Sequence, residues 1–232
     1  MNLPPYLDRV LFLGLPYTAI SVCLLVSLQR YGWRAFTYSS LSSQFLENRT
    51  HFWALVPFHY GILSVLLGHL IGLVVPRTVL AWNGRPLRLY ILEVAALAFG
   101  LLTLIGMLAL INRRLADSKI RAVTSLMDWI MFAVLLFQVA SGVYVAVFYP
   151  WGSTWYAAVA VPYLWSILSL NPDTTIVAQL PLAAQLHIIN AFLLLGLFPF
   201  TRLVHIVVVP NPYLWRRPQV VRWYTSRSGT QS

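Results

Sequence analysis

Five long apolar segments constrain this chain more than any other feature of its sequence. They cover residues 9–28, 52–75, 87–111, 124–148 and 182–209. Each is long enough to cross a hydrocarbon core of ~30 Å as a helix, which takes about 20 residues. The segments lack the alternation of polar and apolar residues that membrane barrel strands show, and they are longer than such strands. The sequence therefore predicts an all-α membrane protein, built as a bundle of five transmembrane helices.

The composition supports this fold class. Only 9% of the 232 residues are charged and 59% are hydrophobic, whereas soluble domains carry about 25% charged residues. We expect a single transmembrane domain over 1–225 and a flexible tail over 226–232. The first residues lack a basic start and a small-residue cleavage site, so we expect no signal peptide.

The basic residues indicate how the bundle is oriented. Of the 16 Lys and Arg residues, twelve lie on one side of the expected bundle and four on the other. The richer side holds the gaps after the first, third and fifth segments, and cytoplasmic loops carry the excess of Lys and Arg in membrane proteins. We therefore expect an outer N-terminus, a cytoplasmic C-terminus and a multi-pass protein of the cell membrane. This distribution accounts for the net charge of +10 without nucleic acid as a partner.

Four histidines within the apolar segments carry the strongest chemical signal. His59 and His69 lie in the second segment, and His187 and His205 lie in the fifth. Histidine is costly in hydrocarbon and usually serves a function there. Because the two helices would run in opposite directions, His59 and His205 share an inner level, and His69 and His187 share an outer one. On each level, two imidazoles can bind one haem iron. Along the helix axis, the two histidines of the second segment would be about 15 Å apart and those of the fifth about 27 Å apart. Helix tilt and a kink near Pro199 must make up the difference.

Other residues suit a haem, although each has a simpler explanation. Glycines beside the histidines would leave room for a flat macrocycle or would serve helix packing; they are Gly61, Gly68, Gly72 and Gly196. Arginines at the inner end would pair with haem propionates or would only mark the topology; they are Arg113, Arg114 and Arg202. The chain lacks the Cys-x-x-Cys-His motif of covalent haem, and its one cysteine, Cys23, fits a small buried hydrophobe.

Two other functions stay open from the residues alone. Intramembrane histidines also serve proton relays and transporters, which usually add membrane-embedded carboxylates. Of the six acidic residues, only Glu93 and Asp128 fall within the segments, both near an end, and this favours haem ligation. A haem-free proton or metal transporter remains an alternative, as does an assembly anchor whose haems stay idle during turnover.

Several motifs resemble one known family. They are Phe-His-Tyr-Gly-Ile-Leu at 58–63, Gly-His at 68–69, Arg-Arg-Leu at 113–115 and Leu-Phe-Pro-Phe-Thr-Arg-Leu-Val-His-Ile at 197–206. With four histidines on the second and fifth helices, the chain is similar over most of its length to the gamma subunit of respiratory nitrate reductase, a membrane cytochrome b.

The resemblance implies two haem b groups, an inner one held by His59 and His205 and an outer one held by His69 and His187. It implies that quinol or menaquinol is oxidised beside the outer haem. Electrons would then cross inward to an iron–sulfur subunit and a molybdenum subunit that reduces nitrate. The chain would be the electron-transfer subunit of that enzyme, with terminal catalysis in a partner.

The quinol pocket departs from the family pattern. The family places a lysine early in the third helix, and Arg88 stands at that position here, with Gly68 and His69 expected to line the same pocket. Arginine keeps the charge and can donate to a quinone oxygen, but it cannot lose its proton. Relatives of this cytochrome also serve membrane complexes of sulfur metabolism and heterodisulfide reductases, and nitrite oxidation is a further alternative, so the terminal substrate stays open.

Overall fold

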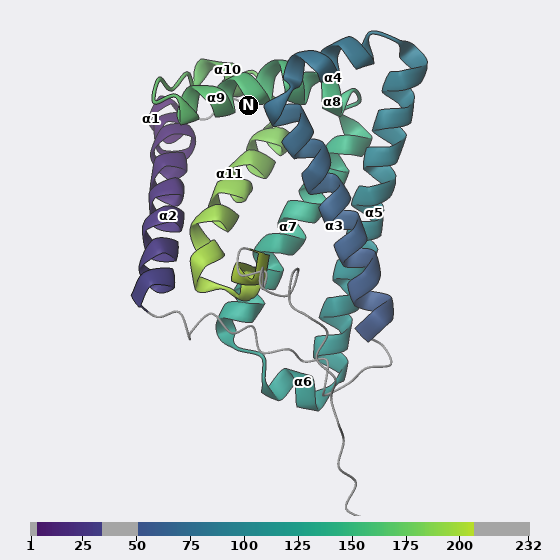
Figure 1. The fold of residues 1–232 in the computed structure, drawn as a ribbon, viewed down its shortest axis with the longest axis vertical. Helices are drawn as coiled ribbons and strands as arrows, with labels where there is room; N and C mark the ends of the chain where they lie inside the picture. The colour runs from purple at the N-terminus through teal and green to yellow at the C-terminus, as the bar shows by residue number, and fades with distance from the viewer. Residues whose placement is uncertain (1–3, 34–50, 207–232) are drawn as a thin grey trace, which may run out of the picture.

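The computed structural model describes residues 4–33 and 51–206. Within these ranges it contains five helical spans long and apolar enough to cross a membrane, and no strand. The predicted fold class is therefore confirmed (Figure 1). The spans are formed by α1 (Pro5–Arg9), η1 (Val10–Gly14) and α2 (Leu15–Trp33) together, then by α3 (His51–Val74), α5 (Pro86–Ala116), α7 (Leu126–Phe148) and α11 (Leu182–Leu197).

Proline and capping side chains set the ends of the spans. Pro76 and Pro86 occupy the first helical positions of α4 (Pro76–Asn83) and α5, where the missing N–H costs no helical hydrogen bond. At the start of α7, Ser125 and Asp128 form a capping box. The Ser125 hydroxyl accepts from the Asp128 backbone N–H, and the Asp128 carboxylate accepts from the Ser125 backbone N–H. Helix α2 continues to Trp33, five residues beyond the expected residue 28, and α5 continues to Ala116, five residues beyond the expected residue 111.

The fifth span ends well before the expected residue 209. Helix α11 stops at Leu197 and is followed by two 3-10 turns, η4 (Phe198–Phe200) and η5 (Arg202–Ile206). Pro199 cannot donate to the helical ladder, and Thr201 has extended backbone angles, φ −113° and ψ 172°. The kink expected near Pro199 is thus a break, and the distance of about 27 Å along a continuous helix does not apply to His205. Residues 207–209 lie outside the described ranges.

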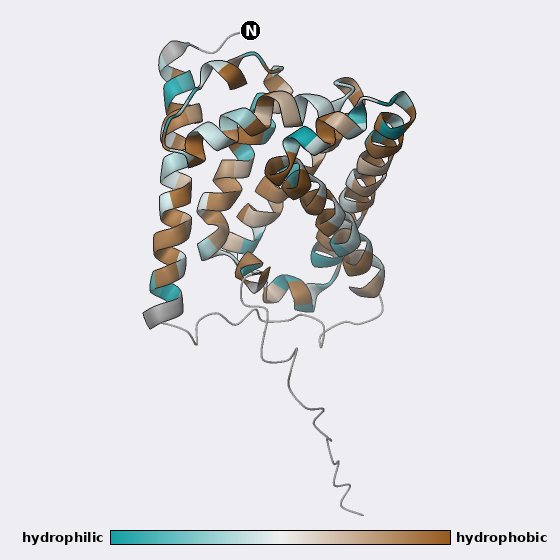
Figure 2. Cartoon of the chain, turned by 45° about the horizontal axis from the view of Figure 1, so that its top comes forward, coloured by the Kyte–Doolittle hydropathy of each residue, from teal (hydrophilic) through white to brown (hydrophobic). Residues whose placement is uncertain are grey.

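The spans form a row of packed neighbours. Helix α3 packs on α5, α5 on α7, α7 on α11, and α11 on α2 (Figure 1). Helices α3 and α11, which carry His59, His69 and His187, are not among the closely packed pairs of the described residues. Large apolar side chains such as Leu25, Leu67 and Ile105 are more than half exposed, and hydrophobic residues dominate the long helices in Figure 2. Such a surface suits lipid rather than water.

Short helices cover the end of the bundle at which α3 ends and α11 begins. They are α4, α8 (Gly152–Trp155), the π-helical η3 (Tyr156–Ala160), α9 (Val161–Leu168) and α10 (Thr175–Ala178) (Figure 1). Tyr163 of α9 is completely buried. Its hydroxyl donates to the Phe12 carbonyl at 2.8 Å, and the two rings meet edge to face with centroids 6.2 Å apart. Residues 149–181, which include α8 to α10 and contain no Lys or Arg, are therefore packed against the bundle. At the opposite end lies α6 (Ser118–Ala122).

Candidate functional site

His69 of α3 and His187 of α11 come together at the covered end of the bundle. Their ring centroids are 6.5 Å apart, and the ring planes are inclined by 36°. Two imidazoles that bind one metal ion from opposite sides, each through a nitrogen at about 2 Å, have ring centres roughly 6 Å apart. The separation of His69 and His187 therefore suits a haem iron between them.

The two histidines of α3 share one hydrogen-bond arrangement. Nδ1 of His69 lies 2.8 Å from the Val65 carbonyl oxygen, and Nδ1 of His59 lies 2.9 Å from the Leu55 carbonyl oxygen. A carbonyl only accepts, so Nδ1 carries the proton in both rings and Nε2 carries the lone pair. Metal-binding histidines are usually held in this way, with one ring nitrogen donating to a backbone carbonyl and the other facing the metal.

Polar side chains of α7 hold the ring of His187. The Ser141 hydroxyl lies 2.9 Å from His187 Nδ1, and the Gln138 amide nitrogen lies 3.0 Å from Nε2. Gln138 is fixed in turn, because its side-chain oxygen Oε1 accepts a hydrogen bond from the Asn190 side-chain amide at 2.7 Å. A metal bound to His187 Nε2 would take the place of the Gln138 contact. Sequence reasoning missed this network, although Gln138, Ser141 and Asn190 are polar residues within apolar spans, which is itself a signal.

The glycines near the histidines have distinct surroundings. A Cβ at Gly61 would lie 2.4 Å from Thr103 Oγ1, so this glycine lets α3 approach α5. A Cβ at Gly196 would be in ordinary contact with Ala19, at 3.6 Å. A Cβ at Gly142, which the sequence did not single out, would lie 3.0 Å from His187 Cε1. At Gly68, beside His69, a Cβ would meet no atom within 4 Å. Of the four, Gly68 is therefore the one whose surroundings suit a flat group beside the helix.

The inner level is described only in part. His59 is half-buried, and its ring lies edge to face with Phe58, with centroids 5.4 Å apart. His205 lies in η5, but its side chain is outside the described part of the chain. The pairing of His59 with His205 therefore stays a prediction.

The three inner arginines take part in contacts of their own. Arg202 Nε lies 3.0 Å from Asp128 Oδ1, and the Asp128 side chain is 9% exposed. Arg114 donates to Thr124 Oγ1 at 2.9 Å and stacks over the Phe132 ring. Arg113 is buried. Arg114 and Arg202 thus stabilise the start of α7 at the inner end, and the pairing of all three with haem propionates stays a prediction.

Arg88 lies in the first turn of α5, at the covered end of the bundle. Its guanidinium carbon is 5.0 Å from the ring centroid of Trp82, and the Trp82 indole N–H donates to the Arg88 carbonyl at 3.3 Å. The side chain is exposed. The described residues show no hydrogen bond or ring contact between Arg88 and His69, so the lining of the quinol pocket stays a prediction.

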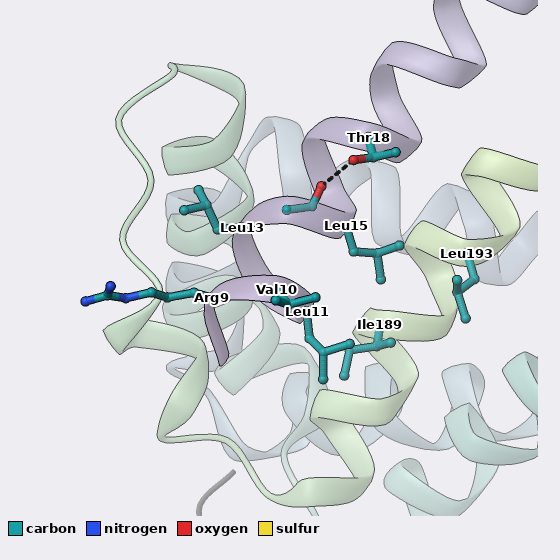
Figure 3. A pocket seen from close by; sticks show the side chains of 9 residues that line it. Arg9, Val10, Leu11, Leu13, Leu15, Thr18, Ile189 and Leu193 are labelled. Atoms are coloured by element: carbon teal, nitrogen blue, oxygen red, sulfur yellow. Dashed lines mark hydrogen bonds between the residues drawn. The ribbon is translucent and has the colours of Figure 1, made fainter. Parts of the chain in front are cut away.

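An open apolar groove lies elsewhere, between η1 and α11. Leu11 and Ile189 face each other across it, and Arg9 at its edge extends away from them (Figure 3). No histidine lines this groove. Within the described residues, no group of three or more His, Cys, Asp and Glu side chains forms a protein-built metal site either. The histidine pair itself is therefore the feature that suits a cofactor, because the porphyrin supplies the other iron ligands.

The chain is similar to known proteins over nearly its whole length. Residues 8–224 match the family model described as nitrate reductase gamma subunit. The chain is 34% identical over 224 residues to the respiratory nitrate reductase 2 gamma chain of Escherichia coli (strain K12), covering 94% of this chain and 97% of the relative. It is 31% identical over 218 residues to the nitrate reductase gamma chain of Bacillus subtilis (strain 168), and the match covers 92% of this chain and 97% of that relative. A third relative, the nitrate reductase-like protein NarX of Mycobacterium tuberculosis (strain ATCC 25618 / H37Rv), is 32% identical over 225 residues that form 33% of its length.

Proposed function

This chain belongs to the nitrate reductase gamma subunit family, and we propose that it binds two b-type haems and oxidises quinol for a respiratory nitrate reductase. It is a five-span membrane protein and, as a member of this family, a subunit of an oxidoreductase complex. The observation that carries the proposal is the approach of His69 to His187, at 6.5 Å between ring centroids.

The histidines and their partners would prepare the outer haem site. When bound, each haem accepts and releases one electron at a time. The hydrogen bond from His69 Nδ1 to the Val65 carbonyl fixes the tautomer and the orientation of the ring, so that Nε2 would be the ligating nitrogen. Ser141 fixes His187 in the same manner from α7. Both imidazoles are thus held in place before a haem binds, and they would need little reorganisation to ligate its iron.

The inner site would be built from the other ends of the same two spans. His59 has the same Nδ1 contact to a backbone carbonyl as His69, which supports a role as ligand. His205, three residues after Arg202 in η5, would supply the second imidazole. Arg113, Arg114 and Arg202 lie at this end and would balance the propionate charge. Two haems one above the other would carry electrons across the bilayer.

Quinol would be oxidised beside the outer haem, with Arg88, Gly68 and His69 as the lining residues. Arginine does not serve as a proton acceptor in proteins, so Arg88 would bind and orient a quinol oxygen rather than take its proton. Its stacking on Trp82 restricts the guanidinium to one region of the surface. The protons would leave on the outer side.

The partners follow from the family. An iron–sulfur subunit would receive the electrons on the cytoplasmic side, and a molybdenum subunit would reduce nitrate. This assignment requires an outer N-terminus and a cytoplasmic C-terminus, as the distribution of basic residues indicates.

The function is tested by adding a menaquinol analogue to membranes that contain the full complex and recording the haem absorption. Fast reduction of the haems, followed by reoxidation when nitrate is added, is the expected result. If quinol reduced the haems but nitrate did not reoxidise them, the cytochrome would be assigned to another oxidoreductase, such as one of sulfur metabolism. Haems that quinol does not reduce would contradict the proposed electron path.

A further inference from the structure

Tyr156 contacts the outer histidine from a segment that is remote in sequence. It is the first residue of η3, the π-helical turn that lies over the end of α3. Its hydroxyl donates to the His69 carbonyl oxygen at 3.0 Å. Its ring meets the His69 imidazole edge to face, with centroids 5.0 Å apart and planes inclined by 69°. The backbone and the ring of His69 are thus contacted by one side chain.

Gly72 provides the space for this contact. It lies three residues after His69 on α3 and is buried. A Cβ at Gly72 would lie 2.6 Å from Tyr156 Cε1 and 2.9 Å from Cδ1, which is too close for any side chain without movement of the phenol ring. Glycine here therefore lets the Tyr156 ring lie against α3 next to the imidazole.

The segment that carries Tyr156 is attached to the bundle by other bonds as well. The Trp165 indole N–H donates to the Leu73 carbonyl at 2.9 Å, and the Tyr163 hydroxyl donates to the Phe12 carbonyl at 2.8 Å. The π-helical turn adds a residue to the helical repeat, and such turns often occur at functional sites. The segment that carries Tyr156 is therefore held against the bundle independently of the bond between Tyr156 and His69.

We propose that Tyr156 is a positioning residue for the outer haem, which sets the rotation of the His69 imidazole and its angle to the His187 ring. This inference rests on the proposed function, because it assumes that His69 and His187 are ligands of one haem. The Val65 carbonyl restrains the Nδ1 side of the His69 ring, and Tyr156 restrains the ring by its edge-to-face contact.

The consequence is electronic as well as structural. In a haem with two imidazole ligands, the angle between the ring planes controls the EPR g values of the ferric iron. The hydrogen bond also supports the backbone from which the ligand projects, and such second contacts tune the reduction potential.

The test compares Tyr156→Phe and Tyr156→Ala with Tyr163→Phe in the full complex in membranes. Tyr156→Phe removes only the bond to His69, whereas Tyr163→Phe removes an equivalent bond of the same segment that does not touch the site. Haem content, a redox titration and EPR spectra are recorded for each variant. We expect both haems to be retained, with shifted g values and potential of the outer haem in Tyr156→Phe, larger shifts in Tyr156→Ala and none in Tyr163→Phe.

Gly72→Ala gives a second, independent readout. Alone it should displace the phenol ring and shift the outer haem in the way that Tyr156→Ala does. Added to Tyr156→Ala it should cause no further shift, since the ring that it displaces is already absent. Unchanged spectra in both Tyr156 variants, or equal shifts in Tyr156→Phe and Tyr163→Phe, would overturn the inference. Absence of haem from the wild-type complex would instead refute the proposed function itself.

Discussion

The imidazole rings of His69 and His187 lie 6.5 Å apart at an angle of 36°, although their helices, α3 and α11, do not pack closely on each other. Each helix packs mainly on another partner, α3 on α5 and α11 on α7 and α2. Such an arrangement suits a flat cofactor between the two histidines better than direct helix packing, and the predictions below follow from it.

Replacement of single histidines should remove one haem at a time. His69→Ala and His187→Ala should each halve the haem content and abolish the outer haem signal, because a haem with one axial ligand is held weakly. His59→Ala and His205→Ala should abolish the inner signal instead. A redox titration, together with the haem-to-protein ratio, shows whether the inner or the outer haem has been lost. If His69→Ala removed the same haem as His59→Ala, the pairing across α3 and α11 would be incorrect.

Gly142→Val should disturb the outer haem from the α7 side. Even a Cβ at this position would lie 3.0 Å from His187 Cε1, so the larger side chain must displace the imidazole, at a cost of about 1–3 kcal/mol. We expect lower occupancy of the outer haem, measured from the optical spectrum. Gly100→Ala is the control, because its Cβ would lie 3.4 Å from Val143 Cγ2, in ordinary contact. Equal haem spectra in the two variants would show that the space at Gly142 is not needed.

Arg88→Ala should slow the reduction of haem by a quinol analogue while both haems stay bound. A charged hydrogen bond contributes about 1.5–3 kcal/mol, so the rate at low quinol should fall roughly tenfold or more. Arg88→Lys should retain most of the rate because it keeps the charge. Arg85→Ala, which removes an exposed arginine at the same end of α5, is the control. Stopped-flow rates for Arg88→Ala that match those of the wild type would exclude Arg88 from the quinol site.

Asp128→Asn should weaken the inner end of the bundle. The substitution removes the carboxylate that pairs with Arg202 in η5, at 3.0 Å. Because Arg202 is partly exposed, we expect a loss of only about 1–2 kcal/mol in stability. Since η5 also carries His205, the inner haem should be lost before the outer one on heating. Asp117→Asn, at the cap of α6, should leave the order of loss unchanged. If Asp128→Asn lost the outer haem first on heating, the pair of Asp128 and Arg202 would not be what stabilises the inner haem site.

The five spans could be predicted because hydrocarbon imposes a minimum helix length on apolar sequence. The outer histidine pair could be proposed because two antiparallel helices bring His69 and His187 to one level. The end of α11 at Leu197 could not be predicted, because a proline such as Pro199 either bends a helix or ends it. Here the helix ends, because the backbone of Thr201 is extended. The contact of Tyr156 with His69 depends on a tertiary fold that no local pattern reports.

The orientation of the chain is tested by a reporter fused after Ser232. Twelve of the 16 basic residues lie on the side assigned to the cytoplasm, so the positive-inside rule predicts a reporter that is active only in the cytoplasm. Alkaline phosphatase and a fluorescent protein give opposite signals on the two sides. Phosphatase activity outside the cell would reverse the topology and with it the direction of electron flow.

The most direct test of the dihaem assignment is a reduced-minus-oxidised optical spectrum of the purified chain, recorded with a haem-to-protein ratio. We predict two b-type haems per chain that differ in midpoint potential and are both reduced by a quinol analogue. A folded chain that binds no haem under conditions of haem excess would contradict the account, and the pair of His69 and His187 would then need an explanation in proton or metal transport.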